Sequence, residues 1–316
     1  MQFENIKKNL IFSLLAGFAI IVVILLYGDV KQIVIALKHF DFKYLGVILC
    51  IMPFNFFIRF LKYNYYFNFM EFNMSMRDKI IIFLSGLCMS ITPAKVGEIV
   101  RPYMIKVKYN IPMSRSLPLL VAERVSDAFG MLILSVIGLF SFKKGVLSIA
   151  TVLLILLLLV MIVHNKKACY FLIEKASKIK FLKKHICKFK NFYESSYVLF
   201  ETKSLIVGIV TGVFAWGCEA LVIFITARAF GEYLSIFNAF FIIGFSALVG
   251  GASMLPGGIG VTDGSILGLL KLCGFSNTLS VSITLFSRFS TLWLGVMVGM
   301  VAMFISDKNG FLQRKT

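Results

Sequence analysis

The chain has 316 residues, of which 59% are hydrophobic, and 33 lysines and arginines against 15 acidic residues give it a net charge of +18. Its mean hydropathy is +0.89, and it contains several apolar runs of about 18 residues or more, the length that crosses a bilayer as helix. These features exclude a soluble protein. The basic residues cluster beside the apolar runs, where they set orientation and meet anionic headgroups, so we expect membrane lipids and no nucleic acid as partners.

The first apolar run, from Leu10 to Tyr27, follows two lysines. It is long for the apolar core of a secretory signal, and no small-x-small cleavage site follows it. We therefore expect a retained first membrane span.

The next apolar region is broken at its middle by the segment Ser90–Arg101, which contains Pro93 and Gly97. Only about 14 apolar residues precede the proline, too few to span comfortably. Basic residues occur on both sides of 79–112, in an expected loop before it and again after it, and by the positive-inside rule both flanks should be cytoplasmic. The basic residues before it are Arg59, Lys62, Arg77 and Lys79, and those after it include Lys106, Lys108 and Arg115. The simplest solution is a re-entrant hairpin that enters from the cytoplasm.

Charged residues follow the first break and continue into the next expected span, at about 117–142. Glu98 and Arg101 are three residues apart on the segment leaving the tip, and Glu123, Arg124 and Asp127 share one side of the span. Charges at membrane depth cost several kcal/mol each and persist when paired or functional. The alternative reading is a set of ion pairs that ties the hairpins to the bundle.

After a span at about 145–163, the segment 164–203 contains ten lysines and three glutamates. We expect it to be cytoplasmic, as amphipathic helix on the inner surface with its lysines facing anionic lipid. The following span, at about 204–228, has Glu219 at its middle.

The second break lies in 236–274 and reads Pro256-Gly257-Gly258-Ile259-Gly260, with Asp263 three residues further on. The last span, at about 278–305, contains Arg288, and Lys308, Arg314 and Lys315 argue for a cytoplasmic C-terminus. The second break then becomes the tip of a hairpin entering from the opposite face, although its first leg is long enough to span instead.

The pattern is a repeat of span, broken hairpin and span with an arginine, first in 43–142 and again, inverted, in 204–305. Pro93 precedes Arg124 by 31 residues and Pro256 precedes Arg288 by 32. We predict an all-α polytopic membrane protein, 1–316, forming a single membrane domain of about six transmembrane helices and two re-entrant hairpins, with both termini cytoplasmic, in the cell membrane. Such inverted repeats are typical of transporters, whose site lies at the breaks.

The residues expected to bind substrate are three arginines and three tip glycines, because arginine binds phosphate bidentately and a half-helix that begins inside the membrane directs backbone N–H groups at an anion. They are Arg101, Arg124, Arg288, Gly97, Gly258 and Gly260. The acidic residues are candidates for coupling or ion pairing, namely Glu98, Glu123, Asp127, Glu219 and Asp263. The six cysteines and three histidines are too dispersed for a metal site, and no cofactor is expected.

At these same residues the chain resembles the lysylphosphatidylglycerol synthase transmembrane family, a flippase-like integral membrane domain. The matching motifs are a Pro-x-x-x-Gly-Glu segment (Pro93, Gly97, Glu98, with Arg101), Glu123-Arg124, the second Pro-Gly-Gly-x-Gly break with its acid, and Arg288. Ala94 and Lys95 stand where the family usually has Gly-Arg, and Asp263 where Glu is commoner. The resemblance covers about 10–305 and implies a lipid-translocating bundle, without the soluble aminoacyl-transferase domain.

The expected function is therefore a flippase that moves a phosphate-bearing lipid, either a phospholipid or a polyprenyl-phosphate-linked lipid, between leaflets. The alternatives are a non-catalytic membrane partner of a glycosyltransferase or lipid-modifying enzyme, and an ion-coupled transporter of a soluble anion. No nucleotide-binding motif occurs, and no nucleophile and base constellation indicates an enzyme.

Overall fold

The computed structural model describes residues 30–139, 146–166, 169–171, 175, 186–308 and 310–311. Every regular element in these ranges is a helix, which confirms the all-α class. The expected first span, much of the basic loop 164–203 and the last basic residues, 314 and 315, lie outside the described residues.

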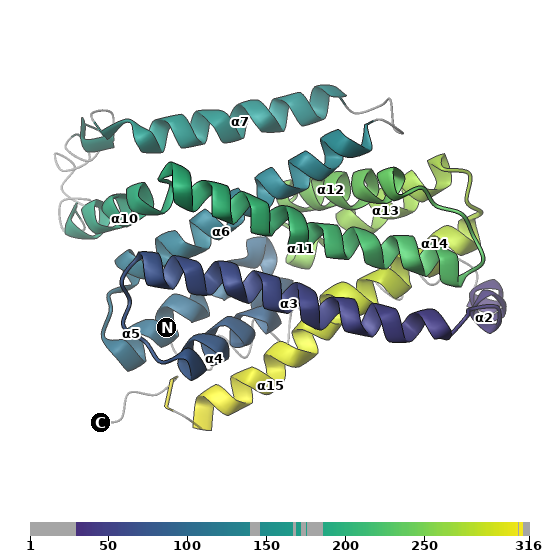
Figure 1. The fold of residues 1–316 in the computed structure, drawn as a ribbon, viewed down its shortest axis with the longest axis horizontal. Helices are drawn as coiled ribbons and strands as arrows, with labels where there is room; N and C mark the ends of the chain where they lie inside the picture. The colour runs from purple at the N-terminus through teal and green to yellow at the C-terminus, as the bar shows by residue number, and fades with distance from the viewer. Residues whose placement is uncertain are drawn as a thin grey trace.

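The first half of the chain forms a long helix, a broken hairpin and a second long helix (Figure 1). Its elements are α2 (Val30–Lys38), α3 (Lys43–Phe69), α4 (Met76–Leu87), the 3₁₀ turns η1 (Cys88–Ile91) and η2 (Pro93–Ile99), α5 (Val100–Tyr109) and α6 (Met113–Gly138).

Among the described residues, two helices lie between the halves, namely α7 (Val146–His164) and α10 (Ile186–Leu199). The second half repeats the order of the first: α11 (Thr202–Ala229), α12 (Ile236–Ala252), the 3₁₀ turn η3 (Pro256–Gly258), α13 (Val261–Leu272), α14 (Asn277–Arg288), the π-helical turn η4 (Phe289–Trp293) and α15 (Leu294–Lys308). The last three elements form one continuous helix.

Three helices among the described residues are long and apolar enough to cross a membrane, namely α3, α11 and the continuous helix Asn277–Lys308. The helix α6 has 26 residues but contains three charges at its centre. The expected spans at 117–142, 204–228 and 278–305 correspond to α6, α11 and the α14–α15 helix, and that at 145–163 corresponds to the 19-residue α7.

One sequence expectation is wrong. Arg59 and Lys62 were expected in a cytoplasmic loop, but α3 continues unbroken to Phe69 and both residues lie in its interior, with Lys62 only 1% exposed. The apolar segment does not end at the first cation because these two side chains find buried partners, described below. The basic flank before the first hairpin is thereby reduced to Arg77 and Lys79.

The first broken segment is a hairpin whose two legs return to the same end of the bundle. Lys108 in the last turn of α5 is 2.9 Å from Asp78 in the first turn of α4. At the tip, Thr92 is extended, as residues before proline prefer, and Pro93 begins the next turn. The chain therefore reverses there rather than continuing as one helix.

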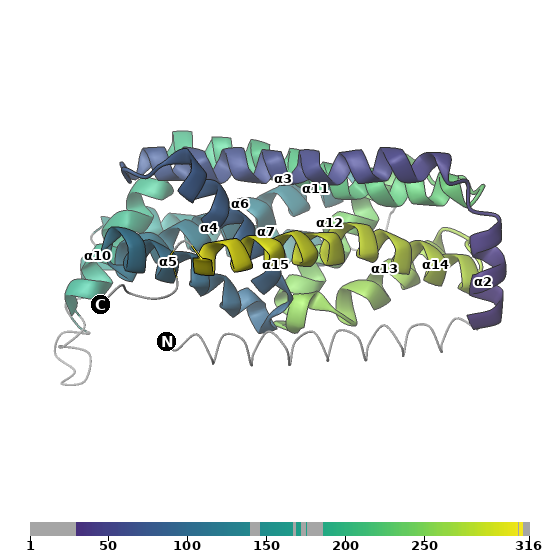
Figure 2. The same cartoon turned by 90° about the horizontal axis from the view of Figure 1, so that it is seen from below.

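The second broken segment forms the matching hairpin, with α12 and α13 packed together. Its tip needs left-handed backbone at Gly257 (φ 57°), Gly258 (φ 66°) and Gly260 (φ 88°), a conformation that glycine adopts without strain. The two tips touch one another in the middle of the molecule. Figures 1 and 2 show that α4 and α5 approach from one end and α12 and α13 from the other, the arrangement expected of an inverted repeat.

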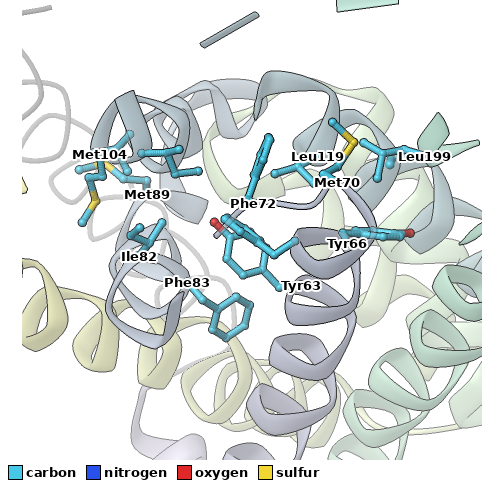
Figure 3. Close-up of a cluster of buried hydrophobic side chains, with 14 of the residues drawn as sticks. Tyr63, Tyr66, Met70, Phe72, Ile82, Phe83, Met89, Met104, Leu119 and Leu199 are labelled. Atoms are coloured by element: carbon cyan, nitrogen blue, oxygen red, sulfur yellow. The ribbon is translucent and has the colours of Figure 1, made fainter. Parts of the chain in front are cut away.

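The described residues form two large apolar cores, each with side chains from both halves of the chain. The first contains aromatic and sulfur side chains of α3, α4 and α5 with residues of α6 and α10 (Figure 3), among them Tyr63, Phe83 and Met104. The second joins α2 to α11, α12, α13 and α14. The space between the two cores holds the candidate site.

Candidate functional site, a charged cavity between two broken hairpins

A cavity of about 590 Å³ lies between the two tips. Its walls come from α3, α6, α7, α11, α12 and the α14–α15 helix, and many of its lining side chains are apolar, such as Phe56, Met131 and Ile243. Because residues of both hairpin tips line it, the cavity lies at the junction of the two halves.

Eight charged side chains line the cavity, four arginines and four carboxylates. They are Arg59, Arg101, Arg124, Arg288, Glu98, Glu123, Asp127 and Glu219. The lining is therefore neutral when all eight are ionised. Seven of them come from the first half and α11, and Arg288 alone comes from the second arginine-bearing helix.

The first hairpin is tied to α6 by two crossed ion pairs. Arg101 of α5 binds Glu123 of α6 at 2.8 Å, and Glu98 of η2 lies 3.3 Å from Arg124 of α6. Glu98 lies in the 3₁₀ turn η2 and Arg101 in α5, and each binds a residue of α6. The tertiary pairs, not the local spacing, decide which charges meet.

Arg101 is enclosed. Its side chain is 2% exposed, and its guanidinium carbon lies 5.4 Å from the ring centres of both Tyr63 and Phe83. It passes directly over Gly86 of α4, where an added Cβ would stand 1.7 Å from the arginine Nε. Arg101 therefore acts as a fixed tie between hairpin and bundle.

Arg124 is the most accessible cation of this cluster. Its side chain is 34% exposed, and three carboxylates lie near its Nη2: Glu98 at 3.3 Å, Glu123 at 3.5 Å and Asp127 at 3.9 Å. Its Nε has no hydrogen-bond partner in the described part of the chain. The guanidinium is attracted by three carboxylates at 3.3 to 3.9 Å, and about a third of the side chain remains exposed in the cavity lining.

The sequence reasoning missed two cations of the site, both on α3. Lys62 binds Asp127 at 2.5 Å with both side chains 1% exposed. Arg59 lies 3.4 Å from Asp127 and 2.9 Å from Glu219, and it stacks over the ring of Trp216 at 5.0 Å. Their sequence could have indicated this, because Arg59 and Lys62 are three residues apart, as on one face of a helix, and no helix breaker follows them in the aromatic segment.

The second tip is organised by one carboxylate. Asp263 accepts from the Gly260 backbone N–H at 2.8 Å and binds Arg288 Nε at 2.6 Å. Arg288 Nη2 donates to the Gly257 carbonyl at 3.0 Å. Arg288 thus joins α14 to the tip and the start of α13, while Asp263 stands behind it, outside the cavity lining.

The three predicted tip glycines are placed differently. Gly258 lines the cavity, but Gly97 and Gly260 do not. The Gly97 N–H donates to the Thr92 hydroxyl at 2.8 Å, and the Gly260 N–H is bound by its own aspartate. At these two positions the chain's own oxygens occupy the donors that were expected to bind an anion.

Within the described ranges, no group of three His, Cys, Asp or Glu side chains could hold a metal ion. The charged groups that line the cavity can exchange ion-pair partners and donate hydrogen bonds through their guanidinium groups. Together, the fold and the cavity define a polytopic all-α membrane protein with a charged internal site between two broken-helix hairpins.

Residues 14–299 match the family described as the lysylphosphatidylglycerol synthase TM region, and the chain belongs to this family. It is 23% identical over 234 residues to a UPF0104 membrane protein of Methanothermobacter thermautotrophicus, covering 65% of this chain and 68% of the relative. It is 25% identical over 233 residues to a UPF0104 membrane protein of Methanocaldococcus jannaschii, covering 70% of this chain and 94% of the relative.

Proposed function

We propose that this protein moves a phosphate-bearing lipid between the leaflets of the cell membrane, without acting as an enzyme. The observation that supports this most is the cavity itself. It lies where hairpins from opposite ends of the bundle meet, and it combines four arginines with apolar walls. A headgroup with phosphate oxygens and a hydrocarbon body matches both parts of that lining.

The arginines differ in how readily they could bind a phosphate. Arg101 is enclosed and binds Glu123 at 2.8 Å, so it holds the architecture, although its buried Nε, like that of Arg124, has no hydrogen-bond partner among the described residues. Arg124 has longer contacts and a third of its side chain exposed, so phosphate oxygens can replace the carboxylates around it. Arg288 provides the second cation on the opposite wall.

The balanced charge of the lining affects the free energy of phosphate binding. A bound phosphate adds negative charge to a balanced set of buried ions, and uncompensated charge at membrane depth is costly. Glu98 contacts only the accessible Arg124 among the described cations, so its ion pair is the one that a phosphate bound to Arg124 would replace.

The test is reconstitution of the full chain in liposomes with fluorescent phospholipids and polyprenyl phosphates, with chemical quenching of the outer leaflet. Arg124→Gln should slow the leaflet exchange at least about tenfold, the effect of losing one charge-assisted bond. Arg228→Gln, a cation of α11 that stacks on Phe224 and Tyr233 away from the cavity, is the matched control.

Wild-type protein that accelerates no lipid but takes up inorganic phosphate would identify a soluble-anion transporter instead. A protein whose cellular function tolerates Arg124→Gln but not deletion within 164–203 would be a docking subunit for a glycosyltransferase or lipid-modifying enzyme. Either result would overturn the proposal.

A further inference from the structure

A second, smaller cavity lies beside the central one, as a groove of about 290 Å³ between α2 and α14. Its lining is apolar apart from one ion pair and one serine; Leu37 of α2, Leu285 of α14 and Phe289 of η4 are representative. Leu37 is 39% exposed and Phe289 is 60% exposed, so the groove opens at the surface of the bundle.

The groove is adjacent to the charged cavity, and two residues border both spaces. Arg288 and Leu292 line both spaces, and Asp263 lines the groove side only. The Arg288–Asp263 pair and Leu292 therefore form the partition. The partition includes part of the π-helical turn η4, a distortion that often occurs at functional sites.

Arg288 retains donors for a ligand at this junction. Its Nε donates to Asp263 and its Nη2 to the Gly257 carbonyl, and none of the described residues accepts from Nη1. An amphiphile with an anionic end could place that end on Arg288 and its apolar part in the groove. A purely apolar helix has no group that would match the arginine.

We propose that the groove between α2 and α14 holds one hydrocarbon chain of the transported lipid while its phosphate binds Arg288. This inference rests on the proposed function and extends it, because it assigns the two ends of the lipid to two different spaces. The apolar lining stabilises the chain by removing it from contact with water and from competition with other bilayer lipids.

The test uses full-length protein in phosphatidylcholine vesicles that contain phosphatidic acid with a photoreactive group at the end of one acyl chain. Labelled peptides are located by mass spectrometry. We expect label on α14 at Ser282 or Leu285 and on α2 at Leu37. Leu285→Trp, which fills the groove without touching the central cavity, should reduce this label about tenfold, equivalent to losing the burial of about two methylene groups.

Val301→Trp is the matched control, because Val301 is 61% exposed on α15 and lines neither cavity. Leu37→Trp fills the groove from the opposite wall. A similar loss of label in Leu37→Trp and Leu285→Trp would show that occupation of the groove, and not misfolding of one variant, reduces the label. Gel filtration checks that both variants are folded. Label that is spread equally over the exposed face of α7 and unchanged in both groove variants would overturn the inference.

The two proposals fail separately. Groove labelling without leaflet exchange would leave the chain-binding site standing and refute transport. Leaflet exchange that both groove variants leave unchanged would leave transport standing and refute the groove. A crosslink from a photoreactive residue at position 285 to the apolar run 10–27 would show that this chain's own segment occupies the groove, which also refutes the inference.

Discussion

Removal of Arg101 tests whether the crossed ion pairs hold the first hairpin to the bundle. In Arg101→Leu, Glu123 loses its bond at 2.8 Å while remaining 3% exposed, and the closest remaining cation is Arg124 at 3.5 Å. Breaking a buried pair from one side costs about 3–5 kcal/mol, because the remaining charge stays desolvated. Since the second arginine compensates in part, we expect about 3 kcal/mol.

The assay is thermal unfolding of the purified protein in detergent. A loss of about 3 kcal/mol corresponds to a decrease in Tm of roughly 5 °C for a chain of this length. Adding Glu123→Gln to Arg101→Leu removes the stranded charge and should recover more than half of the lost Tm. If the double variant is less stable than Arg101→Leu, the cost does not come from an unpaired carboxylate and the reasoning is refuted.

Three further predictions concern the same network and use the same assay. Gly86→Ala places a Cβ 1.7 Å from Arg101 Nε and should lower the free energy of unfolding by about 1–3 kcal/mol. In the Arg101→Leu background the same change should cost much less, because the clashing Nε is gone. Additive losses in the double variant would contradict this explanation. Lys62→Met removes the closest cation of Asp127, leaves only Arg59 at 3.4 Å and Arg124 at 3.9 Å among the described cations, and should cost about 3 kcal/mol. A second change, Asp127→Asn, should largely restore the loss, and an unchanged Tm in the single variant would show that the Lys62–Asp127 pair is dispensable. Asp263→Ala removes both the acceptor of the Gly260 N–H and an ion pair at 2.6 Å and should cost about 2–4 kcal/mol. Protease sensitivity should increase at the second tip rather than the first, and cleavage at the first tip would argue against this local role.

The positions of most helices could be predicted from the lengths of the apolar runs and the positions of helix-breaking residues. The expected spans at 204–228 and 278–305 coincide with α11 and the α14–α15 helix, and both broken segments turn at their prolines. The exception is α3, where Arg59 and Lys62 resembled a basic loop. A cation in a sequence ends a membrane helix only if it lacks a buried partner, and the partners, Asp127 and Glu219, lie more than 60 residues away in the sequence.

The residues that line the cavity could also be predicted in part. Four of the six predicted binding residues, Arg101, Arg124, Arg288 and Gly258, line the cavity. Their relative accessibility could not be predicted, because it depends on which carboxylate approaches which arginine in three dimensions.

By itself, the sequence determined the membrane class, the inverted order of span and broken hairpin, and the family motifs, since hydrophobic length and Pro-Gly breaks are local properties of the chain. Only the tertiary structure decided the pairing of Arg101 with Glu123 and of Glu98 with Arg124, and the groove beside Arg288. Ion pairs and cavities form between helices that are distant in sequence, and their geometry follows from how the two hairpins meet.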